Sequence, residues 1–95
     1  MLKLVVLVRR GEGVSHDELV AKWRDVHMPA VIKHVQPVGY RVTFFDNDAA
    51  FDGMATLYFA DPEKARRWYA TADLASALND GFFAVTDGKP VVLVC

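Results

Sequence analysis

The chain has 95 residues and a mass of 10.6 kDa, and 53% of its residues are apolar, so it is long enough for one compact domain and too short for two. Eleven basic residues stand against twelve acidic ones, and the basic residues are scattered, which excludes the concentrated positive charge that binds nucleic acid. The longest apolar run, residues 4–8, is far shorter than the roughly 20 residues that cross a bilayer, and no basic leader with a cleavage site follows Met1. We therefore expect one domain over residues 1–95, soluble and cytoplasmic, with neither nucleic acid nor membrane as a partner.

The N-terminal third predicts a strand followed by a helix. Residues 1–10 are rich in Leu and Val and end at a cluster of charge and glycine, which favours a strand. Ser15, followed three residues later by Glu18, has the form of a capping box and marks the start of a helix. The apolar face of that helix consists of residues that recur every three or four positions: Leu19, Trp23, Val26, His27 and Ala30. Pro29 lacks an amide hydrogen, so we expect the helix to kink or end near His27 and to continue irregularly to His34.

The middle of the chain predicts a hairpin of two strands. Residues 39–45 alternate in the two-residue period of a strand, and residues 51–60 alternate again. Residues 46–48, Asp-Asn-Asp, separate the two segments and are typical of a turn, because their short polar side chains bond back to the backbone.

The C-terminal third predicts a second helix and a last strand. Asp61 is placed as an N-cap with Pro62 at the first helical position. The apolar face of this helix consists of Ala65, Trp68, Tyr69 and Ala72. The next apolar residues fall off that face, so we expect a break near Asp73 and a second short helix after it. Residues 91–94 then form the last strand, which ends at Cys95.

The order strand, helix, strand, strand, helix, strand predicts an α+β fold, a ferredoxin-like βαββαβ sandwich with a four-stranded antiparallel sheet and helices on one face. The other face is not polar, since both sides of the outer strands are apolar. The first strand carries Val5 and Leu7 on the side opposite Leu4 and Val6, and the last strand carries Val91 and Leu93 on the side opposite Val92 and Val94. Monomeric proteins rarely expose apolar patches of more than a few hundred Å². We therefore expect a homodimer that pairs sheet to sheet and forms a barrel.

His27 is the main candidate for chemistry, because it is a titratable side chain on the apolar face of a helix. One interpretation is structural, in which His27 caps a free carbonyl near the end of the helix. The other is functional, in which the imidazole acts as a general acid or base or hydrogen-bonds a ligand. His16 and His34 are expected at the surface.

Four aromatic residues are candidates to bind a substrate beside His27: Trp23, Tyr40, Tyr58 and Phe83. The carboxylates of Asp46, Asp48 and Asp52 cluster around the hairpin, but turn preference explains them, so no metal site is expected. Cys95 is the single cysteine and can form neither an internal disulfide nor a zinc site. No phosphate-binding or nucleotide-binding motif occurs, and no cofactor is expected.

The first strand, the capped helix start and the Trp-x-x-x-His-x-Pro element formed by Trp23, His27 and Pro29 resemble the opening of EthD-like proteins. Looser similarity covers the rest of the chain. These proteins belong to the dimeric α+β barrel superfamily, so the resemblance implies a sheet-to-sheet dimer and a pocket between helices and sheet in each subunit. It also implies that His27 has a functional role. Relatives in the superfamily include cyclases, dehydratases, isomerases and cofactor-free monooxygenases, so the fold does not fix the reaction.

The sequence is compatible with two main functions. The first is a small cofactor-independent enzyme in which His27 performs general acid/base catalysis on an aromatic, polyketide-like or carbonyl-containing molecule, as a cyclase, dehydratase or isomerase. The second is a noncatalytic dimer that binds a hydrophobic small molecule or a partner protein. Haem binding through His27 or His34, which occurs elsewhere in the superfamily, is a third possibility that no residue here singles out.

Overall fold

The computed structural model describes residues 1–69 and 81–95, with the exception of the side chains of Trp68, Tyr69 and Phe83. Four strands form one antiparallel sheet in the order β2-β3-β1-β4. Their bounds are Leu2–Val8 for β1, Gly39–Phe44 for β2, Gly53–Phe59 for β3 and Val91–Val94 for β4. All four strands lie where the sequence predicts them, and their order confirms the ferredoxin-like fold.

The strand register separates the sheet into two faces. Leu4 of β1 lies opposite Leu57 of β3 and Val94 of β4, so these three side chains point to the same face. Leu4 and Leu57 are buried there and belong to the core. The neighbouring residues in each strand, such as Val5, point to the opposite face.

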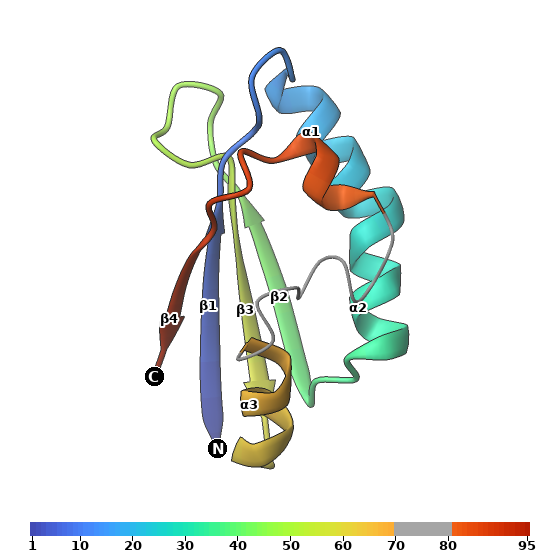
Figure 1. The fold of residues 1–95 in the computed structure, drawn as a ribbon, viewed down its shortest axis with the longest axis vertical. Helices are drawn as coiled ribbons and strands as arrows, with labels where there is room; N and C mark the ends of the chain where they lie inside the picture. The colour runs from blue at the N-terminus through green and yellow to red at the C-terminus, as the bar shows by residue number, and fades with distance from the viewer. Residues whose placement is uncertain (70–80) are drawn as a thin grey trace.

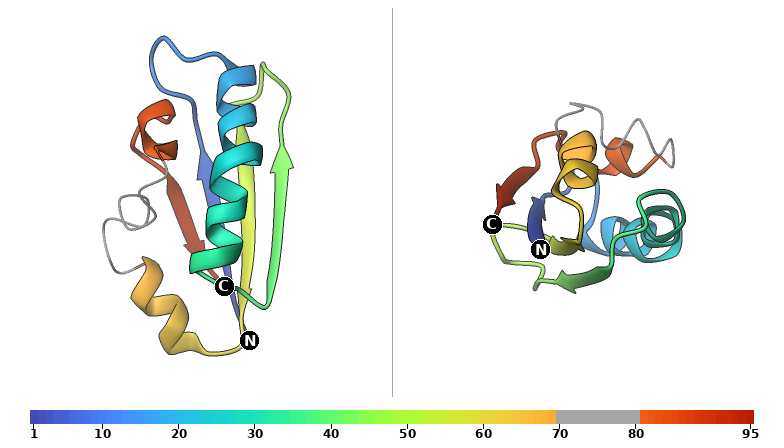
Figure 2. Two further views of the ribbon diagram at one scale, coloured as in Figure 1. Left: turned by 90° about the vertical axis from the view of Figure 1, so that its right-hand side faces the viewer. Right: turned by 90° about the horizontal axis from the view of Figure 1, so that it is seen from below.

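The helices cover only the core face of the sheet (Figures 1 and 2). A continuous helical column is formed by α1 (His16–Lys22), η1 (Trp23–His27) and α2 (Met28–His34). Ser15 caps the column, because its hydroxyl accepts a hydrogen bond from the amide of Glu18 at 3.1 Å, as the sequence predicts. No helix in the described ranges is long and apolar enough to cross a membrane.

Two shorter segments complete the helical layer. The helix α3 (Pro62–Tyr69) begins after Asp61, whose carboxylate accepts a hydrogen bond from the amide of Glu63 at 3.0 Å. The 3₁₀ turn η2 (Phe82–Val85) packs against α1 and η1 (Figure 1). The predicted break near Asp73 and the short helix after it lie outside the described residues.

The helical column is irregular near His27 and continues past Pro29 to His34, as the sequence predicts. The column passes through η1, a π-helical turn in which the amide of Met28 donates to the carbonyl of Trp23, five residues earlier. Such a turn is wider than an α-helical one, so the chain proceeds without the amide hydrogen that Pro29 lacks. The added width also rotates Val26 out of the predicted apolar face, and its side chain is 37% exposed.

The face of the sheet away from the helices is apolar over β1 and β4, except at Lys3 near the start of β1. Val5 pairs with Leu93, and Leu7 pairs with Val91, so all four side chains lie on this face. Leu93 is 49% exposed and Val91 is 37% exposed. The predicted apolar outer face is therefore present in the fold.

Candidate functional site

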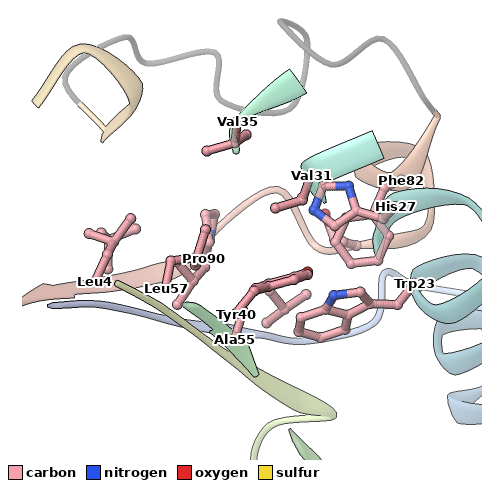
Figure 3. Close-up of a pocket in the computed structure, with 14 residues that line it drawn as sticks. Leu4, Trp23, His27, Val31, Val35, Tyr40, Ala55, Leu57, Phe82 and Pro90 are labelled. Carbon is pink, nitrogen blue, oxygen red and sulfur yellow. The ribbon is translucent and has the colours of Figure 1, made fainter. Parts of the chain in front are cut away.

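A cavity of about 90 Å³ lies between the helical column and the sheet (Figure 3). Its lining comes from all four strands, from η1, α2 and η2, and from the segments next to them, and it consists of Leu4, Val6, Val8, Trp23, His27, Val31, Val35, Tyr40, Ala55, Leu57, Phe82, Thr86, Pro90 and Val92. Most of these side chains are hydrocarbon. The side-chain polar groups belong to Trp23, His27, Tyr40 and Thr86, so a ligand in this cavity would meet few hydrogen-bonding partners.

His27 lies at the end of η1 and is half-buried at the cavity. Its ring stacks on that of Phe82, with 4.1 Å between the ring centroids and 18° between the planes. The indole of Trp23 approaches the same imidazole at 6.5 Å and 69°. Because both nitrogen atoms lie in the plane of the imidazole, stacking on Phe82 orients the ring without covering its polar edge.

The capping interpretation of His27 does not agree with the fold. The helical column continues through α2 to His34, so His27 lies in its interior and not near its C-terminal end. The actual end follows Val35, where Gln36 adopts a left-handed conformation with φ of 54°. His34 lies in the last turn and is exposed, as the sequence predicts.

Trp23 forms the wall of the cavity beside His27. Its side chain is 1% exposed and packs edge-on against Phe44, with ring centroids 5.6 Å apart. A Cβ atom at Gly53 would lie 2.5 Å from Cζ3 of this indole, so only glycine allows the close approach to β3. The buried Nε1–H of Trp23 has no hydrogen-bond acceptor in the part of the chain that the structure describes.

The structure brings together some of the aromatic residues singled out from sequence and separates others. Tyr40 lines the cavity, and Figure 3 shows its hydroxyl end directed toward Trp23 and His27. Tyr58 faces away from the cavity, because it alternates with the buried Leu57 and Phe59 along β3. Its ring lies instead over Gly39 of the neighbouring strand.

Phe83 belongs to η2 by its backbone, and its side chain lies outside the described set. The adjacent Phe82 lines the cavity, is 3% exposed and stacks on His27. The two phenylalanines are adjacent in sequence, and so short a turn has no period that indicates the direction of either side chain. Phe82 is therefore not among the four residues that the sequence singles out for substrate binding.

A second polar cluster surrounds Asp52, which is buried although the sequence predicts a turn residue. Its carboxylate accepts hydrogen bonds from the backbone amide of Arg10 at 2.7 Å and from the Arg10 guanidinium at 3.2 Å. The same oxygen that meets the guanidinium lies 2.7 Å from Nδ1 of His16. His16 is therefore held beside a buried carboxylate, with a side chain only 13% exposed, and not at the open surface as expected.

Within residues 1–69 and 81–95, no three side chains of His, Cys, Asp or Glu gather closely enough to hold a metal ion. The hairpin carboxylates of Asp46 and Asp48 are exposed, while that of Asp52 is occupied by Arg10 and His16.

The sequence model of the EthD domain matches residues 11–81, a span that includes His27, Trp23 and half of the residues that line the cavity. The chain belongs to the EthD family. No curated protein matches the EthD chain by sequence.

Three solved structures illustrate the fold that this EthD chain shares. An ethyl tert-butyl ether D (EthD) family protein from Bacillus halodurans superposes with a TM-score of 0.74 at 18% identity, covering 100% of this chain and 96% of that one. An EthD-like protein from Ralstonia eutropha gives a TM-score of 0.66 at 24% identity, covering 99% and 88%. A dimeric protein of unknown function with a ferredoxin-like fold from Bacteroides fragilis gives 0.67 at 13% identity, covering 99% and 93%.

Proposed function

We propose that this EthD protein is a small enzyme that performs general acid/base catalysis with its own side chains, without a cofactor, on a carbonyl-containing or phenolic molecule. The observation that carries the proposal is the placement of His27, which stacks on Phe82 at the edge of an otherwise apolar cavity. Imidazole both accepts and donates protons near neutral pH, and an oriented ring in a dry site is suited to proton transfer.

The size of the cavity narrows the substrate class. A volume of about 90 Å³ is well below the 300–1,000 Å³ or so of sites for drug-sized ligands, which favours a molecule, or the reacting part of one, of about a single ring. Cyclisation, dehydration and isomerisation of aromatic or polyketide-like compounds all begin with removal of a proton next to a carbonyl group. A base such as His27 serves each of these reactions.

The proposal is tested by hydrogen exchange on a ring-sized ketone. In D₂O, the protein is expected to accelerate deuterium incorporation next to the carbonyl of cyclohexanone, as measured by ¹H NMR. His27→Gln should reduce the accelerated rate by about 10²- to 10⁴-fold, the usual contribution of a positioned base. His34→Gln is the matched control, because His34 is exposed on the same helical column and should leave the rate unchanged. Equal rates for the two variants would refute the catalytic role of His27.

A noncatalytic binding protein is the second candidate, favoured by the almost entirely hydrocarbon lining of the cavity. It would bind a hydrophobic small molecule with the polar edge of His27 as a hydrogen-bonding partner. The exchange experiment separates the two functions, since a binding protein takes up the ketone without exchanging its protons.

We also propose that two copies assemble sheet to sheet as a homodimer and form a barrel. The support is the outer face of the sheet, where Val5, Leu7, Val91 and Leu93 form a continuous apolar surface. The related protein from Bacteroides fragilis is described as dimeric. Pairing of the two surfaces should bury on the order of 1,600 Å², the size of a standard stable interface.

A further inference from the structure

We propose that the indole N–H of Trp23 donates a hydrogen bond to the carbonyl oxygen of the ligand, and stabilises the negative charge that develops there when His27 removes a neighbouring proton. This inference rests on the proposed function and assigns a second catalytic residue to the same site. Trp23 would then be a specific oxygen-binding group in addition to forming the apolar wall.

Trp23 holds a buried hydrogen-bond donor that has no acceptor among residues 1–69 and 81–95. The side chain of Trp23 is 1% exposed, and its Nε1–H meets no acceptor within the described residues. A buried N–H without a partner costs about 1–3 kcal/mol, so it is retained only where something else accepts the bond. An indole can only donate, and the missing partner must therefore be an acceptor such as an oxygen atom.

The N–H of Trp23 is directed toward the polar end of the cavity (Figure 3). Trp23 lines the cavity, and Figure 3 shows its nitrogen on the side of the indole that faces His27 and the hydroxyl end of Tyr40. At the other end of the cavity, Leu4, Leu57 and Val35 provide only hydrocarbon. A ligand with one oxygen and an apolar body therefore fits in one orientation, with its oxygen at the Trp23 end.

The proposed proton transfer requires only the ligand, His27 and Trp23. His27 accepts the proton from the carbon next to the carbonyl, and the electron pair of the broken C–H bond forms a C=C bond. The carbonyl π pair moves to the oxygen, which becomes an enolate oxygen and accepts a stronger hydrogen bond from Trp23. Return of the proton from the His27 imidazolium to carbon reverses these changes. A single donor placed at such an oxygen typically contributes about 10²- to 10³-fold to the rate.

The test uses two probes of the same shape, cyclohexanone and methylenecyclohexane, which differ only in the replacement of the carbonyl oxygen by CH₂. The chain has two tryptophans, so a ¹⁵N–¹H spectrum contains two indole signals, and Trp68→Phe assigns the signal of Trp23. At millimolar concentration, cyclohexanone should shift the Trp23 indole proton downfield, and methylenecyclohexane should not. Cyclohexanone should also bind about tenfold more tightly than methylenecyclohexane, the usual advantage of one hydrogen bond to a buried donor.

Two variants separate the N–H from the shape of the indole. Trp23→Phe removes the donor together with part of the ring, and a benzothiophene analogue of tryptophan at position 23 removes the N–H and keeps the size. In both variants, the ratio of the dissociation constants of methylenecyclohexane and cyclohexanone should fall to about one. The change in the shape of the cavity affects the two probes equally. Phe44→Leu is the matched control, since it disturbs the packing of Trp23 without removing the N–H, and it should preserve the preference.

The inference is overturned if both probes move the indole signal equally, if the benzothiophene variant keeps the preference, or if neither probe binds. These experiments measure binding, and they are independent of the exchange assay for His27. Selective binding of the ketone without proton exchange would contradict the enzymatic proposal. It would still support Trp23 as the hydrogen-bond donor to the ketone oxygen. Exchange without selectivity would contradict the role of Trp23 alone.

Discussion

Asp52 illustrates how one residue can connect three segments that are distant in sequence. Asp52 lies just before β3, and its carboxylate bonds to Arg10 after β1 and to His16 at the start of α1. Each of its bonds is charge-assisted or made to a backbone amide, and the side chain is only 7% exposed. Removal of the carboxylate leaves buried donors without an acceptor, which costs more than the loss of an exposed pair.

We predict that Asp52→Asn lowers the free energy of unfolding by about 2–4 kcal/mol, because the amide group places donors against the donors of Arg10 and His16. Urea unfolding at one fixed protein concentration measures the change. Asp25→Asn is the control. A hydrogen bond from Arg24 lowers the pKa of the Asp25 carboxyl, but that pair is exposed on both sides, so no change of midpoint is expected. Equal effects of the two substitutions would contradict the assignment of Asp52 to a buried network.

At the scale of single residues, the sequence contained part of the site. The spacing of Trp23 and His27 placed both on the inner face of the helix, and both line the cavity. The alternation in β3 was also sufficient to exclude Tyr58, since Leu57 and Phe59 on either side of it are buried. The network of Asp52 could not be predicted, because its bonds join positions whose proximity is decided only when the hairpin packs against the start of α1.

Among the elements, the π-helical turn η1 determines where the site residues point. The two helix starts and all four strands follow from local signals, namely the capping residues and the alternation of apolar positions. The turn itself was not predicted, because the missing amide of Pro29 is compatible with either a kink or a wider turn. Packing decides between them, since the wide turn allows Trp23 to reach β3 and His27 to stack on Phe82 in the same column.

We predict that Pro29→Ala retains or increases stability but reorients His27. Alanine restores an amide that can donate to the carbonyl of Asp25, so an α-helical turn competes with η1, and proline in a helix interior is about 3 kcal/mol less favourable than alanine. The ring protons of His27 should lose the ring-current shift caused by stacking on Phe82, as measured by NMR. Pro37→Ala, which changes a proline outside the helical column, should leave those shifts unchanged. Unaltered His27 shifts in Pro29→Ala would show that the wide turn does not depend on the proline.

At the scale of the whole molecule, the two faces of the sheet have different roles. The inner face and the helices enclose the cavity, so the proposed chemistry takes place within one subunit. The outer face is apolar where β1 and β4 lie side by side, and more polar toward β2, where Arg41 and Thr43 occur. Such an uneven surface suits a symmetric contact centred on β1 and β4, because charged residues then remain at the rim.

We predict that Leu93→Lys converts the proposed homodimer into a monomer. Leu93 is 49% exposed and belongs to the apolar surface of the outer face, so a lysine at this position would place an ammonium group from each copy into the proposed interface. Sedimentation analysis at one micromolar concentration should give about twice 10.6 kDa for the unmodified chain and about 10.6 kDa for Leu93→Lys. Ile32→Lys is the matched control, because Ile32 is 59% exposed on α2, away from the outer face, and its replacement should leave the mass unchanged. A monomeric unmodified chain would refute the sheet-to-sheet assembly, and a dimer disrupted by Ile32→Lys would instead place the contact on the helical side.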